Sequence, residues 1–317
     1  MAQSEVIDGK ARPKDSLVVN IVGGLGNQLF QYLFGRSLEN VSKLNVVFDT
    51  SDFWHYRLHK GLAIERYFEI KLPLISKEQL EQVPWLCRSR FGKRVASRFI
   101  SRKGSSLKIQ TDYSFDLRKQ PISPYLGEYF LGYWQSQRYF SDEINVVKNS
   151  LCFREEIELA AEQAVDLVNI TFDRAAAVHV RRGDYVTAPS RAPQYALPLE
   201  YYLQGMDMLA SERGVSKFYI FSDDIEWAKL NFPAYYELCF IESSVSNSAG
   251  IDMCLLSKFS EMVISNSSFG WWAAALRKNG NGLVLYPQQW VKKRFLDDET
   301  KIAKTIDGWQ ALNWNVT

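Results

Sequence analysis

Two adjacent arginines stand in a short polar stretch that runs from His179 to Asp184 and reads His-Val-Arg-Arg-Gly-Asp. The guanidinium groups of Arg181 and Arg182 stay charged, and each can bond two oxygens of a phosphate group at once. The pair therefore suits a diphosphate. The alternative is a structural ion pair between an arginine and Asp184 at the edge of a sheet, and these six residues alone favour neither reading.

Two further polar stretches follow apolar runs in the same half of the chain. Ser222–Asp224 comes after a strand-like run, and its carboxylates suit a metal ion, a ribose or the N–H groups of a base. Ser265–Ser268 precedes Phe269 and an aromatic helix, where hydroxyls and free backbone N–H groups make an anion site. Both stretches also suit helix N-caps, and the two roles are compatible.

A glycine-rich turn, Gly23–Gln28, follows the first apolar run. Its start resembles a dinucleotide fingerprint, but Leu29 occupies the position of the third glycine and Asp49 is only a loose match for the ribose-binding acid. A tight strand-to-helix turn remains, which can receive phosphate at the helix N-terminus. The amides of Asn27 and Gln28 favour a functional role over a purely structural turn.

A basic segment, Cys87–Lys108, holds eight Lys and Arg residues and no Asp or Glu. Phe91, Val95 and Phe99 recur at helical spacing, so a helix here would have a basic face opposite an apolar one. Such a helix can lie on an anionic membrane surface. The alternative is a basic helix exposed to solvent.

An aromatic segment, Gly127–Ser136, combines rings with hydrogen-bonding groups. The rings of Tyr133 and Trp134, with the Glu128 carboxylate and the Gln135 amide, suit the faces and hydroxyls of a sugar. Packing in the core is the alternative role for most of the rings.

The elements that must position these residues alternate between strand and helix. We expect strands at Leu17–Val22, Asn45–Asp49, Ala175–Val180, Lys217–Phe221, Glu261–Ser265 and, as the last one, Leu283–Tyr286. We expect helices at Leu29–Val41, Glu155–Asn169, Pro198–Glu212, Ile225–Leu230, Ile251–Phe259 and Phe269–Leu276. This pattern predicts an α/β fold with two doubly wound domains facing a cleft. Their ligands are expected at the carboxyl ends of the strands.

Length and composition exclude several classes of protein. The chain has 317 residues and a net charge of +2, which argues against a nucleic-acid protein with a global basic field. No apolar run approaches the roughly 20 residues that span a bilayer, and the polar residues 1–16 look like a flexible leader rather than a signal peptide. The four cysteines form neither a zinc spacing nor a disulfide framework. We therefore expect a cytoplasmic protein.

Five motifs, in this order, resemble those of the bacterial α-1,2-fucosyltransferases of glycosyltransferase family 11. They are Gly23–Tyr32, Gly132–Gln135, His179–Asp184, Phe221–Asp224 and Ser265–Trp272, and the similarity runs from about residue 17 to residue 290. Each motif alone is weak evidence, but the five in order are specific.

The resemblance implies a GT-B architecture of two Rossmann-like domains. Residues 17–150 would form the acceptor-side domain and residues 151–317 the donor domain, with the last residues packing back on the first domain. It implies an inverting transfer of fucose from GDP-β-L-fucose to the 2-hydroxyl of a galactose, in an oligosaccharide or an O-antigen-type glycan. No cofactor or metal is required.

The resemblance also assigns roles to residues. Arg181 and Asn27 would be catalytic, with Arg181 on the diphosphate and Asn27 near the reacting centre. The donor would contact Gly24, Gly26, Asn27, His179, Arg181, Arg182, Asp184, Ser222, Asp223, Asp224, Ser267, Ser268 and Phe269. The acceptor would contact Glu128, Tyr133, Trp134 and Gln135.

The reaction needs stabilisation of the charge on the leaving GDP, which arginine, hydroxyl and N–H groups can supply. The base that accepts the proton of the acceptor hydroxyl stays open between Asp49, Asp52, His55, Glu128 and a phosphate oxygen. Two alternatives to the leading function stay open as well. One is transfer from another nucleotide sugar, and the other is a glycan-binding module without catalysis. The acceptor, the oligomeric state and membrane contact through residues 87–108 cannot be read from the sequence.

Overall fold

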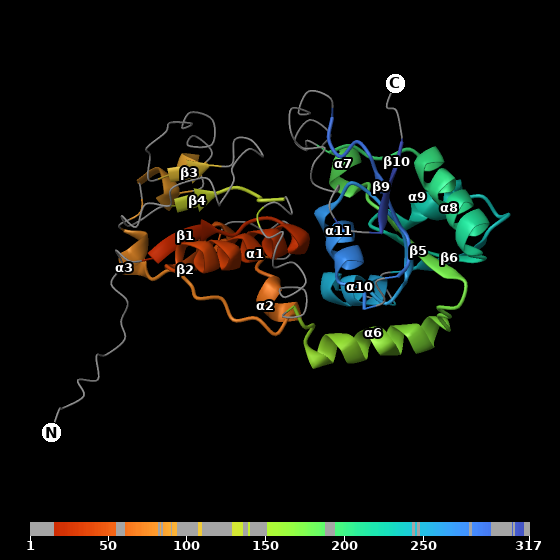
Figure 1. Cartoon of the computed structure of the whole chain (residues 1–317), viewed down its shortest axis with the longest axis horizontal. Coiled ribbons are helices and arrows are strands. Elements are labelled where there is room, and N and C mark those ends of the chain that lie inside the picture. The colour runs from red at the N-terminus through yellow and green to blue at the C-terminus, as the bar shows by residue number, and fades with distance from the viewer. Residues whose placement is uncertain are drawn as a thin grey trace.

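The computed structural model contains two parallel β-sheets, shown in Figure 1. It describes residues 16–54, 61–81, 83, 85–89, 91–93, 107–109, 129–135, 139, 151–187, 194–242, 245, 248–278, 281–292, 306 and 308–313. Every strand pair in the two sheets is parallel. The predicted α/β class with parallel sheets is confirmed.

The N-terminal sheet has the strand order β2-β1-β4-β3. Its strands are β1 (Ser16–Asn20), β2 (Asn45–Asp49), β3 (Leu107–Ile109) and β4 (Tyr129–Leu131). Helix α1 (Leu25–Ser42) makes the crossover from β1 to β2. All five residues of β1 are buried, as expected for a strand with neighbours on both sides and covered faces.

The C-terminal sheet has the strand order β10-β9-β8-β5-β6-β7. Its strands are β5 (Ala175–Val180), β6 (Lys217–Ser222), β7 (Glu237–Ile241), β8 (Glu261–Ile264), β9 (Val284–Pro287) and β10 (Trp309–Leu312). Renumbered from β5, this is the doubly wound order 3-2-1-4-5-6. The order reverses between β5 and β8, and ligands of such sheets bind at that point.

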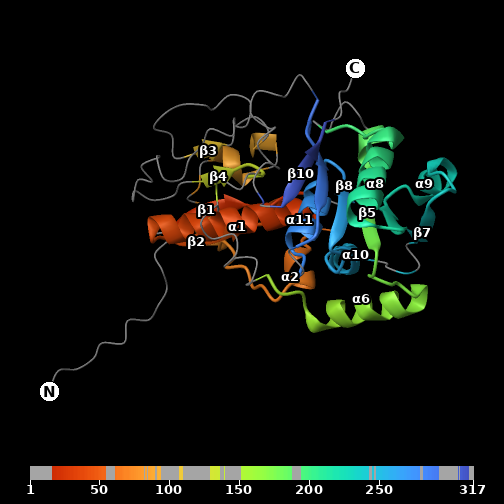
Figure 2. The same ribbon diagram turned by 45° about the vertical axis from the view of Figure 1, so that its right-hand side comes forward.

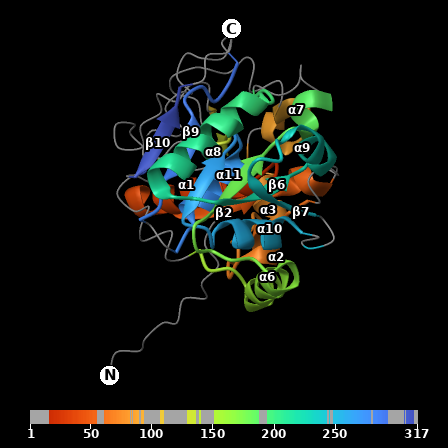
Figure 3. The same cartoon turned by 90° about the vertical axis from the view of Figure 1, so that its right-hand side faces the viewer.

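Helices cover both faces of the C-terminal sheet, and Figure 3 shows α8 and α9 on the outer face. The outer face, which is turned away from the N-terminal sheet, carries α8 (Leu199–Arg213) and α9 (Ile225–Asn231). The inner face, which is turned towards it, carries α10 (Ala249–Leu256) and α11 (Ser268–Ala275). Alternate residues of β5 explain this arrangement. Ala175 and Ala177 belong to the inner cluster, whereas Ala176 and Val178 belong to the outer one.

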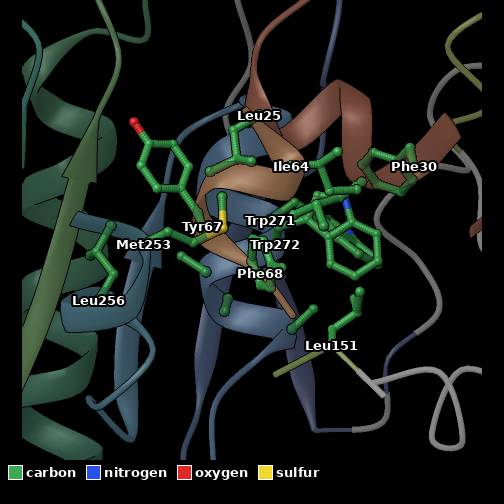
Figure 4. Close-up of a cluster of buried hydrophobic side chains, with 14 of the residues drawn as sticks. Leu25, Phe30, Ile64, Tyr67, Phe68, Leu151, Met253, Leu256, Trp271 and Trp272 are labelled. Carbon is green, nitrogen blue, oxygen red and sulfur yellow. The ribbon is translucent and has the colours of Figure 1, made fainter. Parts of the chain in front are cut away.

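A single buried cluster joins the two sheets. In Figure 4, Phe30 of α1 and Tyr67 of α2 (Ile64–Tyr67) lie against Met253, Trp271 and Trp272 of the inner helices. The ring centroids of Phe30 and Trp271 are 4.8 Å apart. Helix α6 (Glu155–Val168) runs below α2 and α10 in Figures 1 and 2.

Several elements of the structure differ from those expected. Helix α1 begins at Leu25 instead of Leu29, because the glycine turn is shorter than expected and Gly24 already caps the helix. Strand β7 was not predicted. The strand at Val284–Pro287 is followed by β10, so it is not the last one. Residues Trp309–Leu312 extend the C-terminal sheet, and the residues after Asn313 lie outside the described part of the chain.

Within the described ranges, no helix has the length and apolar character needed to cross a membrane.

Candidate functional site

Three polar strand ends meet at the carboxyl edge of the C-terminal sheet. Val180 at the end of β5 pairs with Ser222 of β6, and His179 pairs with Ile264 of β8. The residues that follow these strands are the three stretches that the sequence singled out. Because parallel strands end at the same edge, the fold brings the three stretches together at the point where the strand order reverses.

Arg181 lies between two carboxylates at this edge. Its Nη2 is 2.7 Å from Asp184 Oδ1, and its Nη1 is 2.9 Å from Asp223 Oδ2. Burial alone would lower the pKa of the guanidinium, but Asp223, Tyr185 and Asp184 outweigh it and the pKa is raised. The side chain remains 25% exposed. The arginine is therefore charged, held in one orientation and still accessible from solvent.

Arg182 has different partners from those expected. Its Nε is 3.1 Å from Asp224 Oδ2, and its guanidinium lies 3.8 Å above the ring of Trp227. The ion pair with Asp184, which the sequence allowed for either arginine, is formed by Arg181 and not by Arg182. The structural ion pair is therefore present for each arginine, and Arg181 remains accessible to a ligand such as the expected diphosphate.

Asp223 and Asp224 have separate structural tasks. Asp223 Oδ1 accepts a hydrogen bond from the backbone N–H of Arg182 at 2.8 Å. Asp224 caps α9 by accepting from the N–H of Trp227, and its own N–H donates to Ser222 Oγ. The predicted N-cap is confirmed for Asp224.

His179 is a buried, neutral histidine. Its Nδ1 is 2.9 Å from Ser265 Oγ, and its ring lies 5.6 Å from that of Phe269. Burial, with a smaller effect from Arg181, lowers its pKa to about 3. His179 thus ties β5 to the turn after β8 without adding charge to the site.

The turn after β8 begins α11. Ser267 is the N-cap, and its Oγ accepts a hydrogen bond from the N–H of Phe269. Ser268 Oγ donates to Asn27 Oδ1 at 2.8 Å, which links the two sheet regions. Helix N-termini of this kind attract anions. Among the described residues there is no group of three or more acidic, Cys or His side chains that would hold a metal ion.

The glycine turn before α1 faces this serine turn. Gly23 has φ +91°, a conformation that favours glycine. A Cβ at Gly26 would lie 2.5 Å from the carbonyl carbon of Ser268, so this glycine permits the close approach of α1 and α11. The Gln28 amide is fully used by backbone groups, accepting from Ala63 and Ile64 and donating to the carbonyls of two loops. The Gln28 amide therefore holds backbone segments together, whereas the sequence favoured a role in orienting a ligand.

The predicted acceptor residues lie in different environments. Tyr133 is 49% exposed, whereas Trp134 is fully buried and stacks on Phe34 at 3.9 Å. Trp134 therefore packs in the core, which is the alternative role that the sequence offered for these rings. Gln135 donates to Asn27 Oδ1. Glu128 lies outside the described residues.

Two candidate bases, Asp49 and Asp52, are buried beside a buried lysine. Lys93 Nζ is 2.9 Å from Asp49 Oδ2 and 2.7 Å from Asp52 Oδ2. Burial alone would raise the pKa of Asp49, but Lys93 and the hydroxyl of Tyr129 outweigh it and lower the pKa. Such a carboxylate is a weak base for a sugar hydroxyl. His55, another candidate, is outside the described residues.

The same contacts correct the expectation for the basic segment. Lys93 belongs to a buried ion cluster and not to a solvent-facing basic surface. Lys108 lies on strand β3 and not on a helix. Most of the remaining segment is outside the described residues.

Sequence reasoning missed two aromatic residues at the site. Tyr185 underlies Arg181, with its ring 5.8 Å from the guanidinium carbon, and Trp227 underlies Arg182. Their positions in the sequence could have indicated them. Tyr185 comes directly after the arginine motif, and Trp227 stands three residues after Asp224, the N-cap of α9.

Comparison with known proteins identifies the family. The model of glycosyl transferase family 11 matches residues 16–313. An alpha-1,2-colitosyltransferase of Escherichia coli is 30% identical, with 89% of this chain and 94% of that protein covered. The O-antigen biosynthesis glycosyltransferase WbnK of Escherichia coli is 27% identical over 90% and 97% of the two chains.

More distant similarity extends to animal enzymes and to solved structures. The galactoside 2-alpha-L-fucosyltransferase SEC1 of Bos taurus is 24% identical, covering 81% of this chain and 63% of that protein. The structure of POFUT1 in complex with GDP has a TM-score of 0.52 at 12% identity, covering 87% and 99% of the two chains, and supports the fold. The chain is therefore a glycosyltransferase whose relatives transfer fucose or colitose, and it belongs to glycosyl transferase family 11.

Proposed function

We propose that the protein transfers L-fucose from GDP-β-L-fucose to the 2-hydroxyl of a galactose, with inversion at the anomeric carbon. The observation that carries the proposal is the position of Arg181 and the N-terminus of α11 at the switch point of a doubly wound sheet. The family and its fucosyltransferase members support the choice of sugar.

The leaving diphosphate gains negative charge as the glycosidic bond breaks. An accessible, charged arginine held by two carboxylates needs little reorganisation to stabilise that charge. The hydroxyls and N–H groups at the start of α11 add further donors from the neighbouring strand end. We propose that these groups suffice without a metal ion, so transfer is expected to continue in EDTA.

The sugar carbon develops oxocarbenium character while the acceptor hydroxyl attacks from the opposite face. Asn27 lies on the N-terminal side of this site and touches both Ser268 and Gln135. We assign to Asn27 the orientation of these groups near the reacting centre, and to Tyr133 the contact with the acceptor. We also propose that the two sheet regions form the two domains of a GT-B enzyme, with the donor bound at the C-terminal sheet.

The test replaces Arg181 by alanine and measures transfer from GDP-fucose to a panel of galactosides, with the linkage of each product identified. We expect a loss of two or more orders of magnitude, as for removal of a main group that stabilises the transition state. The control is Arg213→Ala, which breaks an ion pair with Glu261 at the opposite edge of the same sheet. Near-normal transfer by the Arg181 variant would refute the assignment.

A second candidate differs only in the donor sugar. The relative at 30% identity is an alpha-1,2-colitosyltransferase, and colitose is the 3-deoxy analogue of fucose. Assays with GDP-fucose and GDP-colitose separate the two. Thermal shifts with GDP, UDP and dTDP test the nucleotide, because a ligand of the native state raises its stability. Stabilisation by UDP and not by GDP would exclude both candidates.

We also propose that the basic segment 87–108 contacts an anionic membrane surface at the cytoplasmic face. The seven other basic residues of the segment supply the charge for this contact, whereas Lys93 belongs to the buried ion cluster and is not part of the proposed surface. The ring of Phe91 within the segment and that of Trp85 just before it are exposed. Binding to phosphatidylglycerol vesicles should fall as salt is added. Binding that does not respond to salt would contradict it.

A further inference from the structure

Tyr185 joins the arginine loop to the serine turn. It lies on α7 (Gly183–Thr187), the short helix that directly follows the arginines. Its hydroxyl donates to the backbone carbonyl of Asn266 at 3.2 Å, and its oxygen accepts a hydrogen bond from the hydroxyl of Ser267. One phenol thus contacts the turn that starts α11.

The ring of the same tyrosine supports Arg181. The guanidinium carbon lies 5.8 Å from the ring centroid, within the range of a cation–π contact. Asp223 ties Arg181 to the end of β6, whereas Tyr185 ties it to the turn after β8. Burial raises the pKa of Tyr185 well above its ordinary value, so the hydroxyl remains a donor at neutral pH.

The two groups that Tyr185 connects are the two anion-binding elements of the proposed donor site. A diphosphate uses both only when their separation matches the spacing of its phosphates. We propose that Tyr185 is a positioning residue that sets the separation between Arg181 and the N-terminus of α11, so that both bind one nucleoside diphosphate. This inference rests on the proposed function.

The test compares the affinities of GDP and GMP for the unchanged protein and for Tyr185→Phe, measured by calorimetry. The variant keeps the ring and loses the hydrogen bonds to the turn. We expect GDP to bind about 3–10-fold more weakly, the effect of one or two net hydrogen bonds. GMP should change by less than about 2-fold, because a single phosphate does not need the matched separation. KM for the nucleotide sugar should rise more than KM for the acceptor.

The control is Tyr219→Phe. Tyr219 Oη accepts from the N–H of Thr171 in the connection before β5, so the variant loses a tyrosine hydrogen bond away from the site. Its melting temperature should fall without a change in the ratio of GDP to GMP affinity. An unchanged ratio in Tyr185→Phe would overturn the role of Tyr185 alone. Absence of GDP binding by the unchanged protein would overturn the proposed donor and this inference with it.

Discussion

Replacement of Gly26 by alanine tests whether the approach of α1 to α11 is needed for activity. A Cβ at this position would lie 2.5 Å from the carbonyl carbon of Ser268 and 2.6 Å from the N atom of Phe269. Ordinary contact begins at 3.4 Å, so the two backbones must separate by about 0.9 Å. Backbone atoms cannot rotate away as a flexible side chain can.

Two effects follow from this separation. Overpacking of this kind costs roughly 1–3 kcal/mol of stability. The start of α11 also moves away from Asn27, whose Oδ1 accepts from Ser268 Oγ at 2.8 Å. Because displacement of a catalytic group by about 1 Å can cost 10²-fold in rate, we expect transfer to fall by one to two orders of magnitude.

The matched control is Gly35→Ala in the same helix. Its Cβ would lie 2.6 Å from the ring of Phe48, inside the N-terminal sheet region and away from α11. Both variants add one methyl group at a buried position of α1, and both should lower the melting temperature. Only Gly26→Ala should lower kcat/KM at a temperature where both are folded. Normal kcat/KM in Gly26→Ala, with equal loss of stability in the two variants, would refute the reasoning.

Three further predictions concern other parts of the structure. Lys93→Met leaves two carboxylates buried without their partner, so urea unfolding should show a loss of about 3–5 kcal/mol in the free energy of unfolding. The control is Lys217→Met, which removes a more exposed ion pair with Glu237 and should cost less than about 1 kcal/mol. His179 is neutral when folded, with a pKa of about 3, and protonates near pH 6.5 when unfolded. The free energy of unfolding should therefore fall below pH 6.5, by about 2 kcal/mol at pH 5. The His179→Asn variant, which lacks this titration, is the control. If the unchanged protein loses no more stability than this variant between pH 7 and pH 5, the prediction is wrong. Trp134→Ala should cost about 3–5 kcal/mol in thermal unfolding as a core truncation. Tyr133→Ala should leave stability unchanged and raise KM for the acceptor, and the reverse pattern would return Trp134 to the acceptor site.

The C-terminal sheet region was well predicted because its signals are local. Strands such as Ala175–Val180 are continuous apolar runs ended by polar residues, and the helices between them show regular spacing or caps. The structure adds β7 and β10, which sequence reasoning missed. Both are edge strands with exposed residues, so they lack the continuous apolar run of a central strand.

Burial of individual side chains was predicted less well. Trp134 looked like a platform for a sugar, and Lys93 like part of a solvent-facing basic surface. A ring can stack on a sugar or on Phe34, and a lysine can face solvent or two aspartates, with the same residue type in each case. The choice depends on residues more than forty positions away in the chain.

The family, the parallel α/β class and the three polar stretches of the candidate site could be predicted from the chain, because motif order, apolar period and capping residues are local properties. The partner of each charged group, in contrast, is set by the folded molecule. Folding placed Arg181 between Asp184 and Asp223, gave Asp224 to Arg182, and brought Asn27 to Ser268 across 241 positions. The physical reason is that pairing depends on distance in space, which the strand order and the contact between α1 and α11 create only when the whole chain is folded.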